Sequence, residues 1–309
     1  MQSRMREIVD MKVLLTGGAG NVGAYVSREL STHNIPHTLL DLREPAVLKD
    51  GVAFVRCDLM NLAQTQEVVK GYDVVIHLAA IPNAFVDHAE HVMAVNMVTC
   101  YNVLEAVRQN HIPRIVYAGS ESSTGFGIHE VVLKPNYLPI DEAHPLWPHE
   151  SYSFTKRFGE EMAENYARAF GIEVIALRYC GVWMKQNLEE VLSILELPRR
   201  GEPIPHPWFG SYVAAQDVAQ AVRLSAQYQF DGDEEIPFEP FFITAHNTFY
   251  VEQTLEVMKR IYGSLPDVRE PGYYTSNPYA PAFDIRKAQR LLGYAPQKDW
   301  RDIEDWEGV

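Results

Sequence analysis

Tyr152 and Lys156 are the residues of this sequence whose types and spacing most clearly suggest chemistry. They are four positions apart, so on a helix that we expect to run to about Phe170 they would share one face. A phenol is a poor base at neutral pH because its usual pKa is near 10. A neighbouring ammonium favours the phenolate, so Lys156 is predicted to lower the pKa of Tyr152. The pair could then take a proton from an alcohol.

A second tyrosine–lysine pair, Tyr294 and Lys298, has the same spacing but contains Pro296, which disfavours a helix. We therefore select Tyr152. A hydroxyl that binds the substrate oxygen should lie at the end of a neighbouring strand, and Ser120 follows the apolar residues 115–118. Ser122 and Ser123 are alternatives, and the serine cluster could also simply cap a turn.

A glycine-rich stretch follows the apolar residues 12–15 and precedes a helical pattern over residues 22–30. It satisfies two spacings, Gly18-x-Gly20-x-x-Gly23 and Gly17-x-x-Gly20-x-x-Gly23. Glycine lets a pyrophosphate approach bare backbone N–H groups at a helix N-terminus. We therefore predict a dinucleotide held by residues Gly17, Gly20, Asn21, Val22 and Gly23. A plain strand-to-helix connection is the alternative interpretation.

Asp41 indicates which dinucleotide binds. It follows the apolar residues 38–40 and lies 41 − 23 = 18 residues after the last glycine, where a carboxylate would accept hydrogen bonds from the adenosine ribose. A 2′-phosphate would meet a like charge there, so NAD is favoured. Arg43 could reduce that repulsion, which leaves NADP as the second choice. With a nicotinamide present, the proton-accepting pair becomes part of a predicted hydride-transfer site.

Short β-branched runs alternate with amphipathic stretches along the first part of the chain. The runs at 13–15, 52–55, 74–78, 115–118 and 174–177 are predicted to be buried parallel strands. This alternation predicts an α/β fold with a doubly wound parallel sheet of the Rossmann type. It weakens after about residue 180. We expect residues 1–180, with returning segments near 212–245, to bind NAD, and an interleaved smaller C-terminal lobe, 181–309, to bind substrate.

Composition excludes several other classes of protein. The net charge of −14 and the absence of a basic stripe argue against nucleic acid and anionic membranes as partners. The three cysteines are scattered, which predicts reduced thiols and no metal site. No apolar run approaches the length of a membrane span, and residues 1–10 lack the apolar segment of a signal peptide. We therefore expect a cytoplasmic protein.

The residues described so far resemble the extended short-chain dehydrogenase/reductase superfamily, in its NAD-dependent epimerase/dehydratase branch. The resemblance covers nearly the whole chain and implies further cofactor contacts. Asp58 and Leu59 would lie near the adenine. The other implied landmarks are His77 with Leu78, Ala79 and Ala80, then Asn96, Tyr212-Val213, Asp217 to Ala219, and Asp284 to Lys287 before Leu292-Gly293-Tyr294. Gly125 matches the family glycine five residues after the active hydroxyl, which favours Ser120 over Ser122.

Departures from the family pattern narrow the reaction. Dehydratases carry Asp-Glu after the active threonine, whereas Glu121 and Ser122 stand here. Nucleotide-sugar epimerases commonly place an arginine before the Tyr-Val segment, and this chain has Ser211. Their asparagine after the arginine of the sixth strand, here Arg178, is missing as well. Arg199, Arg200 or Arg269 could substitute as diphosphate ligands. Residues 120–126 look more like those of uronate and aldose dehydrogenases.

We expect Ser120, Glu121, Ser122, Tyr152 and Arg178 to contact the substrate. The long segment between Ser120 and Tyr152, rich in proline and aromatic residues, is predicted to shape substrate choice, with a packed Ω-loop as the alternative. Its histidines, which we expect to be packing or surface residues, are His129, His144 and His149.

The hypothesis that these residues favour is an NAD-dependent oxidoreductase acting on a sugar or sugar-acid hydroxyl. An NAD-dependent sugar or nucleotide-sugar epimerase that retains its cofactor is the alternative. A nucleotide-sensing protein without turnover is the third possibility, but a binder has no need of a polarised phenol. Apolar residues cover several faces of the helix expected over residues 88–109, which predicts packing against the core. The resemblance to the family implies the alternative, a homodimer formed through this helix.

Overall fold

A seven-stranded parallel sheet forms the centre of the molecule. The structure is a computed structural model, and it describes residues 11–126, 132–203, 209–232 and 234–309. The strand order is β10-β7-β5-β4-β1-β2-β3, and all neighbours run parallel. The chain builds outward from β1 to β3 and then returns to β4, so the direction of winding switches between β1 and β4. The strands are β1 (Val13–Thr16), β2 (His37–Asp41), β3 (Ala53–Arg56), β4 (Val74–His77), β5 (Arg114–Ser120), β7 (Glu173–Tyr179) and β10 (Phe238–Ile243).

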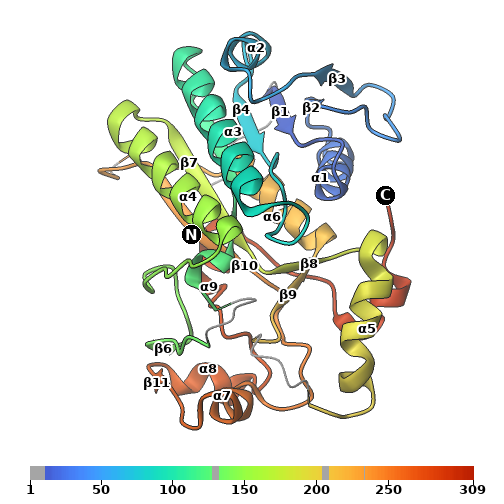
Figure 1. Cartoon of the computed structure of the whole chain (residues 1–309), viewed down its shortest axis with the longest axis vertical. Coiled ribbons are helices and arrows are strands. Elements are labelled where there is room, and N and C mark those ends of the chain that lie inside the picture. Colours follow the sequence, from blue (N-terminus) through green and yellow to red (C-terminus); the bar gives the residue numbers. More distant parts are fainter. Residues whose placement is uncertain (1–10, 127–131, 204–208, 233) are drawn as a thin grey trace.

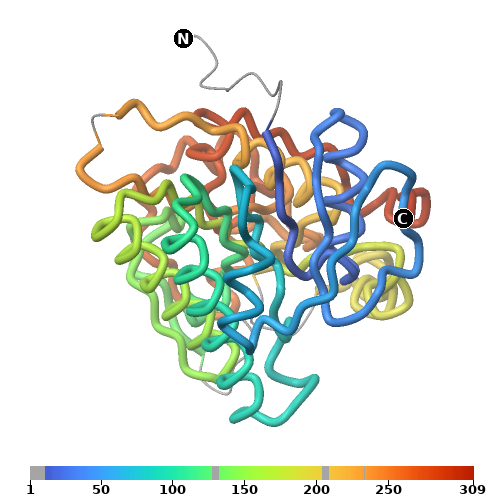
Figure 2. The backbone as a smooth tube through the Cα atoms, turned by 90° about the horizontal axis from the view of Figure 1, so that it is seen from above, coloured from blue at the N-terminus to red at the C-terminus, as the bar shows by residue number. Residues whose placement is uncertain are grey.

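Helices cover both faces of this sheet, as a doubly wound fold requires (Figure 1). One face packs against α1 (Asn21–Thr32) and α6 (Ala215–Gln227). The other is covered by α2 (Leu62–Val68), α3 (Ala89–Gln109) and α4 (Ser151–Phe170), with α3 and α4 side by side. Figure 2 shows α3 and α4, in green, on the opposite side of the molecule from α1, in blue. The predicted α/β architecture is therefore confirmed.

Burial on both faces explains the short apolar runs of the sequence. In β1 the side chains of Val13 and Leu15 enter the core beneath α1 and α6, while Leu14 enters the core beneath α3. The strand predicted at residues 52–55, which is β3, is less buried than expected. β3 lies at the edge of the sheet, where Ala53 and Arg56 are exposed, because no strand covers its outer side.

The smaller lobe lies beyond the carboxyl ends of the strands, at the bottom of Figure 1. Its two short parallel pairs join β8 to β9 and β6 to β11. The chain interleaves the two parts, since α6 and β10 belong to the central layer although they follow β9 in sequence. The remaining elements are β6 (Tyr137–Leu138), β8 (Gly181–Trp183), β9 (Tyr212–Ala214), β11 (Asp267–Val268), α5 (Leu188–Arg199), α7 (Thr254–Tyr262), α8 (Pro271–Ser276), α9 (Arg286–Leu292) and the 3-10 helices η1 (Glu121–Thr124), η2 (Lys185–Asn187) and η3 (Trp300–Asp305).

Candidate active site

The glycine loop connects β1 to α1 at the switch point of the sheet. Gly17 has a φ of +70°, and a Cβ there would lie 2.8 Å from the backbone nitrogen of Ala79. A Cβ on Gly23 would lie 2.3 Å from the carbonyl oxygen of Gly17. Any side chain would therefore displace the backbone, so the turn requires glycine at both positions.

The start of α1 is suited to an anion. Its N-cap is Gly20, which offers no side-chain cap, and the first turn holds no acidic residue. The N–H groups of Asn21, Val22 and Gly23 begin a helix and so have no partner within it. Together with the helix dipole they form a site that fits a pyrophosphate.

Asp41 lies beside this loop, as the spacing predicted. It ends β2, and its Oδ2 atom accepts a hydrogen bond of 3.1 Å from the backbone N–H of Ala19. The backbone N–H of Cys57 bonds to the carbonyl oxygen of Asp41, which brings the exposed Asp58 to the same side. Leu59, which was expected near the adenine together with Asp58, has its side chain buried in the core. Its carbonyl oxygen accepts a hydrogen bond from the Asn102 side chain.

The residues after β4 form the opposite wall of the loop. Leu78, Ala79 and Ala80 are half-buried, and the N–H of Ala79 faces Thr16 and Gly17. Asn96 of α3 uses its amide oxygen to accept from the N–H of Ile81 at 2.7 Å, and its amide nitrogen donates to the carbonyl of Ile81 at 3.1 Å. Asn96 therefore fixes the backbone of this wall at Ile81. The sequence predicted only a cofactor contact for Asn96.

Tyr152 and Lys156 lie in the first turns of α4, and Glu150 caps that helix by accepting from the N–H groups of Tyr152 and Ser153. Lys156 is 6% exposed, and its Nζ donates to the carbonyl oxygen of Ala118 at 2.8 Å. Burial lowers the pKa of Lys156 to about 8.

The pKa of Tyr152 differs from the prediction. Burial raises it, the charge of Glu121 raises it further, and the hydrogen bond to Ser120 lowers it. The Nζ of Lys156 lies 5.6 Å from the centre of the Tyr152 ring and donates to Ala118, so its ammonium does not bond directly to the phenol oxygen.

Ser120 ends β5 and reaches Tyr152, whereas the alternative Ser123 is fully buried in η1. The Ser120 hydroxyl donates to Oε2 of Glu121 at 2.9 Å, and the same oxygen accepts from the N–H of Ser122 at 2.9 Å. The structure thus brings together Ser120, Glu121, Ser122 and Tyr152. Burial raises the pKa of Glu121 to about 7, although these hydrogen bonds oppose the rise.

Arg178, predicted to contact the substrate, is paired with groups of the protein itself. It is 3% exposed, and its Nε and Nη2 atoms donate to the two carboxylate oxygens of Glu160 at 3.1 and 2.6 Å. Its Nη1 donates to the carbonyl of Glu142. Arg178 therefore joins β7 to α4, and its contact with substrate stays a prediction.

Tyr117 is not among the residues predicted from the sequence, although it contacts Lys156. Its ring centre lies 5.6 Å from the Nζ of Lys156, and its hydroxyl donates to the carbonyl of Lys156 at 3.4 Å. A Cβ on Gly159 would lie 2.2 Å from that hydroxyl. A glycine inside an otherwise helical pattern was the available signal, since it allows α4 to approach β5 closely.

The segment between Ser120 and Tyr152 packs into the smaller lobe where it is described. Leu138 and Ile140 enter a core with Phe209 and Phe283. His144 accepts from the N–H of Asn136 and contacts aromatic rings, which confirms it as a packing residue. His149 lies before α4, and its backbone N–H donates to Ser153. His129 and the N-terminal residues 1–10 lie outside the described part.

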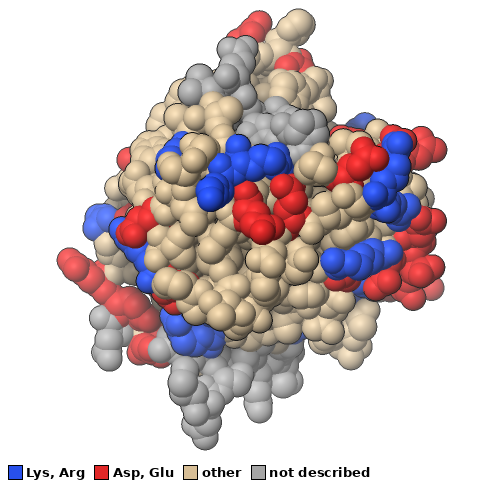
Figure 3. Space-filling model, turned by 90° about the horizontal axis from the view of Figure 1, so that it is seen from below, with Lys and Arg blue, Asp and Glu red and all other residues tan. Residues whose placement is uncertain are grey.

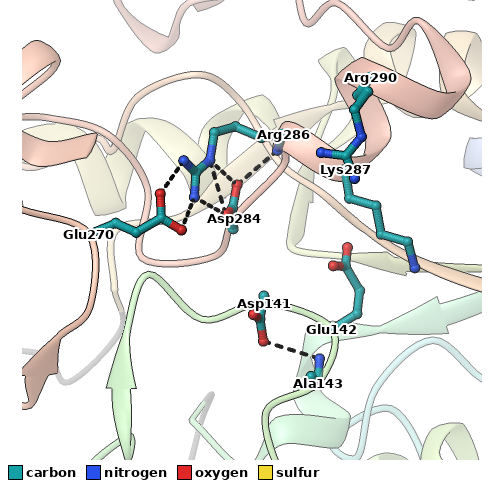
Figure 4. A pocket seen from close by; sticks show the side chains of 8 residues that line it. All are labelled: Asp141, Glu142, Ala143, Glu270, Asp284, Arg286, Lys287 and Arg290. Atoms are coloured by element: carbon teal, nitrogen blue, oxygen red, sulfur yellow. Dashed lines mark hydrogen bonds and ion pairs between the residues drawn. The ribbon is translucent and has the colours of Figure 1, made fainter. Parts of the chain in front are cut away.

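A polar cavity of about 430 Å³ lies between the loop after β6 and the start of α9 (Figure 4). The guanidinium of Arg286 is held by Glu270 and Asp284, and the ammonium of Lys287 by Glu239 at 2.9 Å. These cations are already neutralised, so we assign the cavity no ligand.

The surface offers no continuous basic stripe on the face seen in Figure 3, where Lys and Arg lie beside Asp and Glu. In the described ranges no helix combines the length and apolarity needed to cross a bilayer, and no group of His, Cys, Asp or Glu is arranged to hold a metal ion. The three cysteines are buried and free.

Fold and site together define a dinucleotide-binding enzyme with a tyrosine–lysine–serine site. The model of the NAD dependent epimerase/dehydratase family matches residues 13–191. The chain belongs to this family, so it is an enzyme of the extended short-chain dehydrogenase/reductase kind, and NAD is its cofactor.

Relatives within the family catalyse different reactions. The chain is 33% identical to a Methanocaldococcus jannaschii protein named "Putative UDP-glucose 4-epimerase", over 94% of this chain and 95% of that one. It is 32% identical to L-arabinose 1-dehydrogenase (NAD(P)(+)) of Haloferax volcanii, over 81% and 94%. A Thermus thermophilus UDP-glucose 4-epimerase in complex with NAD shares the fold, with a TM-score of 0.67, 22% identity, and coverage of 95% and 96%.

Proposed function

We propose that the protein is an NAD-dependent dehydrogenase that oxidises a hydroxyl of a sugar carrying no nucleotide. The pairing of its arginines is the main support. Arg199 lies 2.7 Å from Glu304, Arg200 pairs with Glu196, and Arg269 stacks on Tyr137 with its guanidinium 3.3 Å from the ring centre. All three candidates for binding a nucleotide-sugar diphosphate thus already have partners, and Ser211 replaces the arginine that epimerases commonly place before Tyr212.

The charges around Ser120 favour an uncharged sugar over a sugar acid. Glu121 is the carboxylate nearest to Ser120, at 2.9 Å, and would repel a second carboxylate when ionised. Arg178 is neutralised by Glu160. Lys156 donates to a backbone carbonyl. The similarity to L-arabinose 1-dehydrogenase adds support, since arabinose is an uncharged sugar.

In the proposed reaction Ser120 binds the substrate oxygen and Tyr152 accepts its proton. Lys156 keeps a positive charge beside Tyr152, which lowers the cost of forming the phenolate that accepts this proton. Bound NAD supplies the hydride acceptor, and Gly17, Gly23 and Asp41 would position it.

Purified protein mixed with NAD and separate sugars tests the proposal. We expect NADH absorbance with one or more neutral aldoses and none with uronic acids or UDP-sugars. The epimerase alternative is supported by the 33% identity over nearly the whole chain. Interconversion of a UDP-sugar without accumulating NADH would establish that alternative and overturn the proposal.

We also propose a homodimer formed through α3 and α4. Val98 and Tyr101 of α3 and Phe158 of α4 are exposed, and Phe158 stacks on Phe154 with ring centres 5.7 Å apart. The two helices lie side by side on the outer surface of the sheet (Figure 1), so the exposed apolar side chains could meet a second copy.

A further inference from the structure

Lys156 carries a buried charge that has no ionic partner. In the described part of the chain it forms no ion pair with a carboxylate, and its one hydrogen bond is the 2.8 Å bond from Nζ to the carbonyl oxygen of Ala118. Burying an unpaired ammonium is costly, because the protein interior stabilises the charged form less than water does. Neutral groups beside the Nζ atom therefore have to offset part of this cost.

Two aromatic rings lie against the ammonium. The Nζ atom of Lys156 lies 5.6 Å from the ring centre of Tyr117 and 5.6 Å from that of Tyr152. A cation within about 6 Å of a ring face is attracted by the negative charge of that face. Tyr152 is the proposed proton acceptor, whereas the hydroxyl of Tyr117 donates to the backbone carbonyl of Lys156 at 3.4 Å. Tyr117 can therefore stabilise the ammonium without taking part in the reaction.

Strand β5 and helix α4 hold the ring of Tyr117 in place. Tyr117 is 3% exposed and directly precedes Ala118, so one strand supplies both the ring and the carbonyl that contact Lys156. On α4, a Cβ on Gly159 would lie 2.2 Å from the Tyr117 hydroxyl, so this hydroxyl fills the space that a larger residue would need. The ring is therefore fixed between the strand and the helix.

We propose that Tyr117 is a positioning residue of the active site, whose ring face keeps the ammonium of Lys156 charged and in place beside Tyr152. The proposal rests on the role of Lys156 in the proposed function, but it requires no particular sugar. Since the attraction comes from the ring face, the hydroxyl of Tyr117 should be dispensable and the electron density of the ring should not.

The titratable neighbours of Lys156 on β4, β5 and α3, and Tyr152 on α4, are uncharged at neutral pH. Burial, and to a smaller extent the charge of Lys156, lowers the pKa of His77 to about 3. Burial raises the pKa of the Cys100 thiol to about 12, and it raises the pKa of Tyr117 and Tyr152. None of these groups supplies a negative charge to the ammonium.

The first carboxylate after Lys156 on α4 is also occupied. It belongs to Glu160, and both of its oxygens accept from Arg178. Burial lowers the pKa of Lys156 to about 8. A small loss of stabilisation by the ring therefore changes the fraction of Lys156 that is charged near neutral pH.

Two variants of similar shape separate the ring face from the hydroxyl. Tyr117→Phe keeps the face, whereas Tyr117→trifluorophenylalanine keeps the shape and withdraws electrons from the face. In full-length protein with isotopically labelled lysine and no substrate, the NMR resonance missing from Lys156→Met reports the charge of Lys156. We expect its titration midpoint, near pH 8 in the wild-type protein, to stay in Tyr117→Phe. It should fall by about one pH unit, a tenfold change in the equilibrium, in the fluorinated variant.

Tyr166→trifluorophenylalanine is the matched control. Tyr166 also lies on α4 and packs against the same core as Tyr117, but it is 166 − 156 = 10 positions from Lys156. Its fluorination should leave the midpoint unchanged. In turnover, the basic limb of kcat/KM should move to lower pH in the fluorinated Tyr117 variant and stay in Tyr117→Phe and in the control.

A midpoint that is the same in the wild-type protein and in the fluorinated Tyr117 variant would overturn the proposal. An equal fall in Tyr117→Phe would also overturn it, because the effect would then belong to the hydroxyl. If no sugar yields NADH, the dehydrogenase proposal fails, whereas the NMR midpoint still decides the role of Tyr117.

Discussion

The Nζ atom of Lys156 lies 5.6 Å from the centre of the Tyr152 ring, on the same face of α4. Its hydrogen bond to the carbonyl of Ala118 fixes the ammonium against β5, so the lysine position depends on how closely α4 approaches that strand. Gly159 allows this approach beneath Tyr117. The active site is therefore a property of helix–strand packing as well as of the tyrosine–lysine spacing.

Replacing Lys156 by methionine should stabilise the protein while abolishing its activity. Burial lowers the lysine pKa from 10.5 to about 8, so the unfolded chain holds this proton more tightly than the folded one. Below pH 8 the buried charge lowers the free energy of unfolding, and the loss fades between about pH 8 and 10.5. We expect the free energy of unfolding at pH 7 to rise by roughly 1–2 kcal/mol, a figure that already allows for the lost hydrogen bond to Ala118. Urea unfolding of both proteins at pH 7 and pH 10 measures this difference in the free energy of unfolding. A difference that does not shrink at the higher pH would contradict a lowered pKa for Lys156.

Removing one member of the Arg178–Glu160 pair should unfold the protein more easily. Arg178→Met leaves a buried carboxylate without its cation, which we expect to cost about 3–5 kcal/mol. The double change Arg178→Met/Glu160→Met should recover much of that loss. If Arg178 is structural, as its burial indicates, the double variant keeps the wild-type KM for the sugar. A large rise in KM would return Arg178 to the substrate site.

Asp41→Asn should weaken NAD binding and improve NADP binding. The amide keeps an oxygen for the N–H of Ala19 but loses the charge that attracts the ribose hydroxyls and repels a 2′-phosphate. We expect a roughly tenfold weaker Kd for NAD, about 1.4 kcal/mol. Calorimetric titration with both dinucleotides measures the change, and unchanged Kd values for both would show that Asp41 does not face the ribose.

Phe158→Glu should convert the proposed dimer to a monomer. The side chain is 42% exposed on α4, and a charge there would be buried in a paired-helix interface. Leu265→Glu is a matched control, since Leu265 is 40% exposed after α7, away from α3 and α4. Light scattering gives the mass of each variant. A wild-type monomer, or a Phe158→Glu variant that remains dimeric, would refute the α3–α4 interface.

Local patterns predicted the parts of the structure that depend on local chemistry. The glycine spacing at residues 17–23 predicted the turn before α1, because only glycine fits there. The alternation of apolar runs predicted β1, β4, β5 and β7, because these inner strands are buried on both faces. The distance of Asp41 from the last glycine predicted its position beside the loop, because the βα unit that separates them has a nearly fixed length.

Pairings between distant segments could not be predicted in this way. Nothing near Arg178 in the sequence predicts its ion pair with Glu160, which lies 18 residues earlier on another element. The exposed edge of β3 depends on the strand order. The raised pKa of Tyr152 depends on burial and on Glu121, which only the fold brings beside it.

Hydride tracing with a perdeuterated neutral aldose and unlabelled NAD tests the central claim most directly. We predict that one deuterium appears in free NADH, detected by mass spectrometry, and that Tyr152→Phe lowers the transfer about 10²–10⁴-fold while still binding NAD. Deuterium that stays in the sugar pool without free NADH would contradict the account, as would inversion of a UDP-sugar carbinol in a parallel reaction with that substrate.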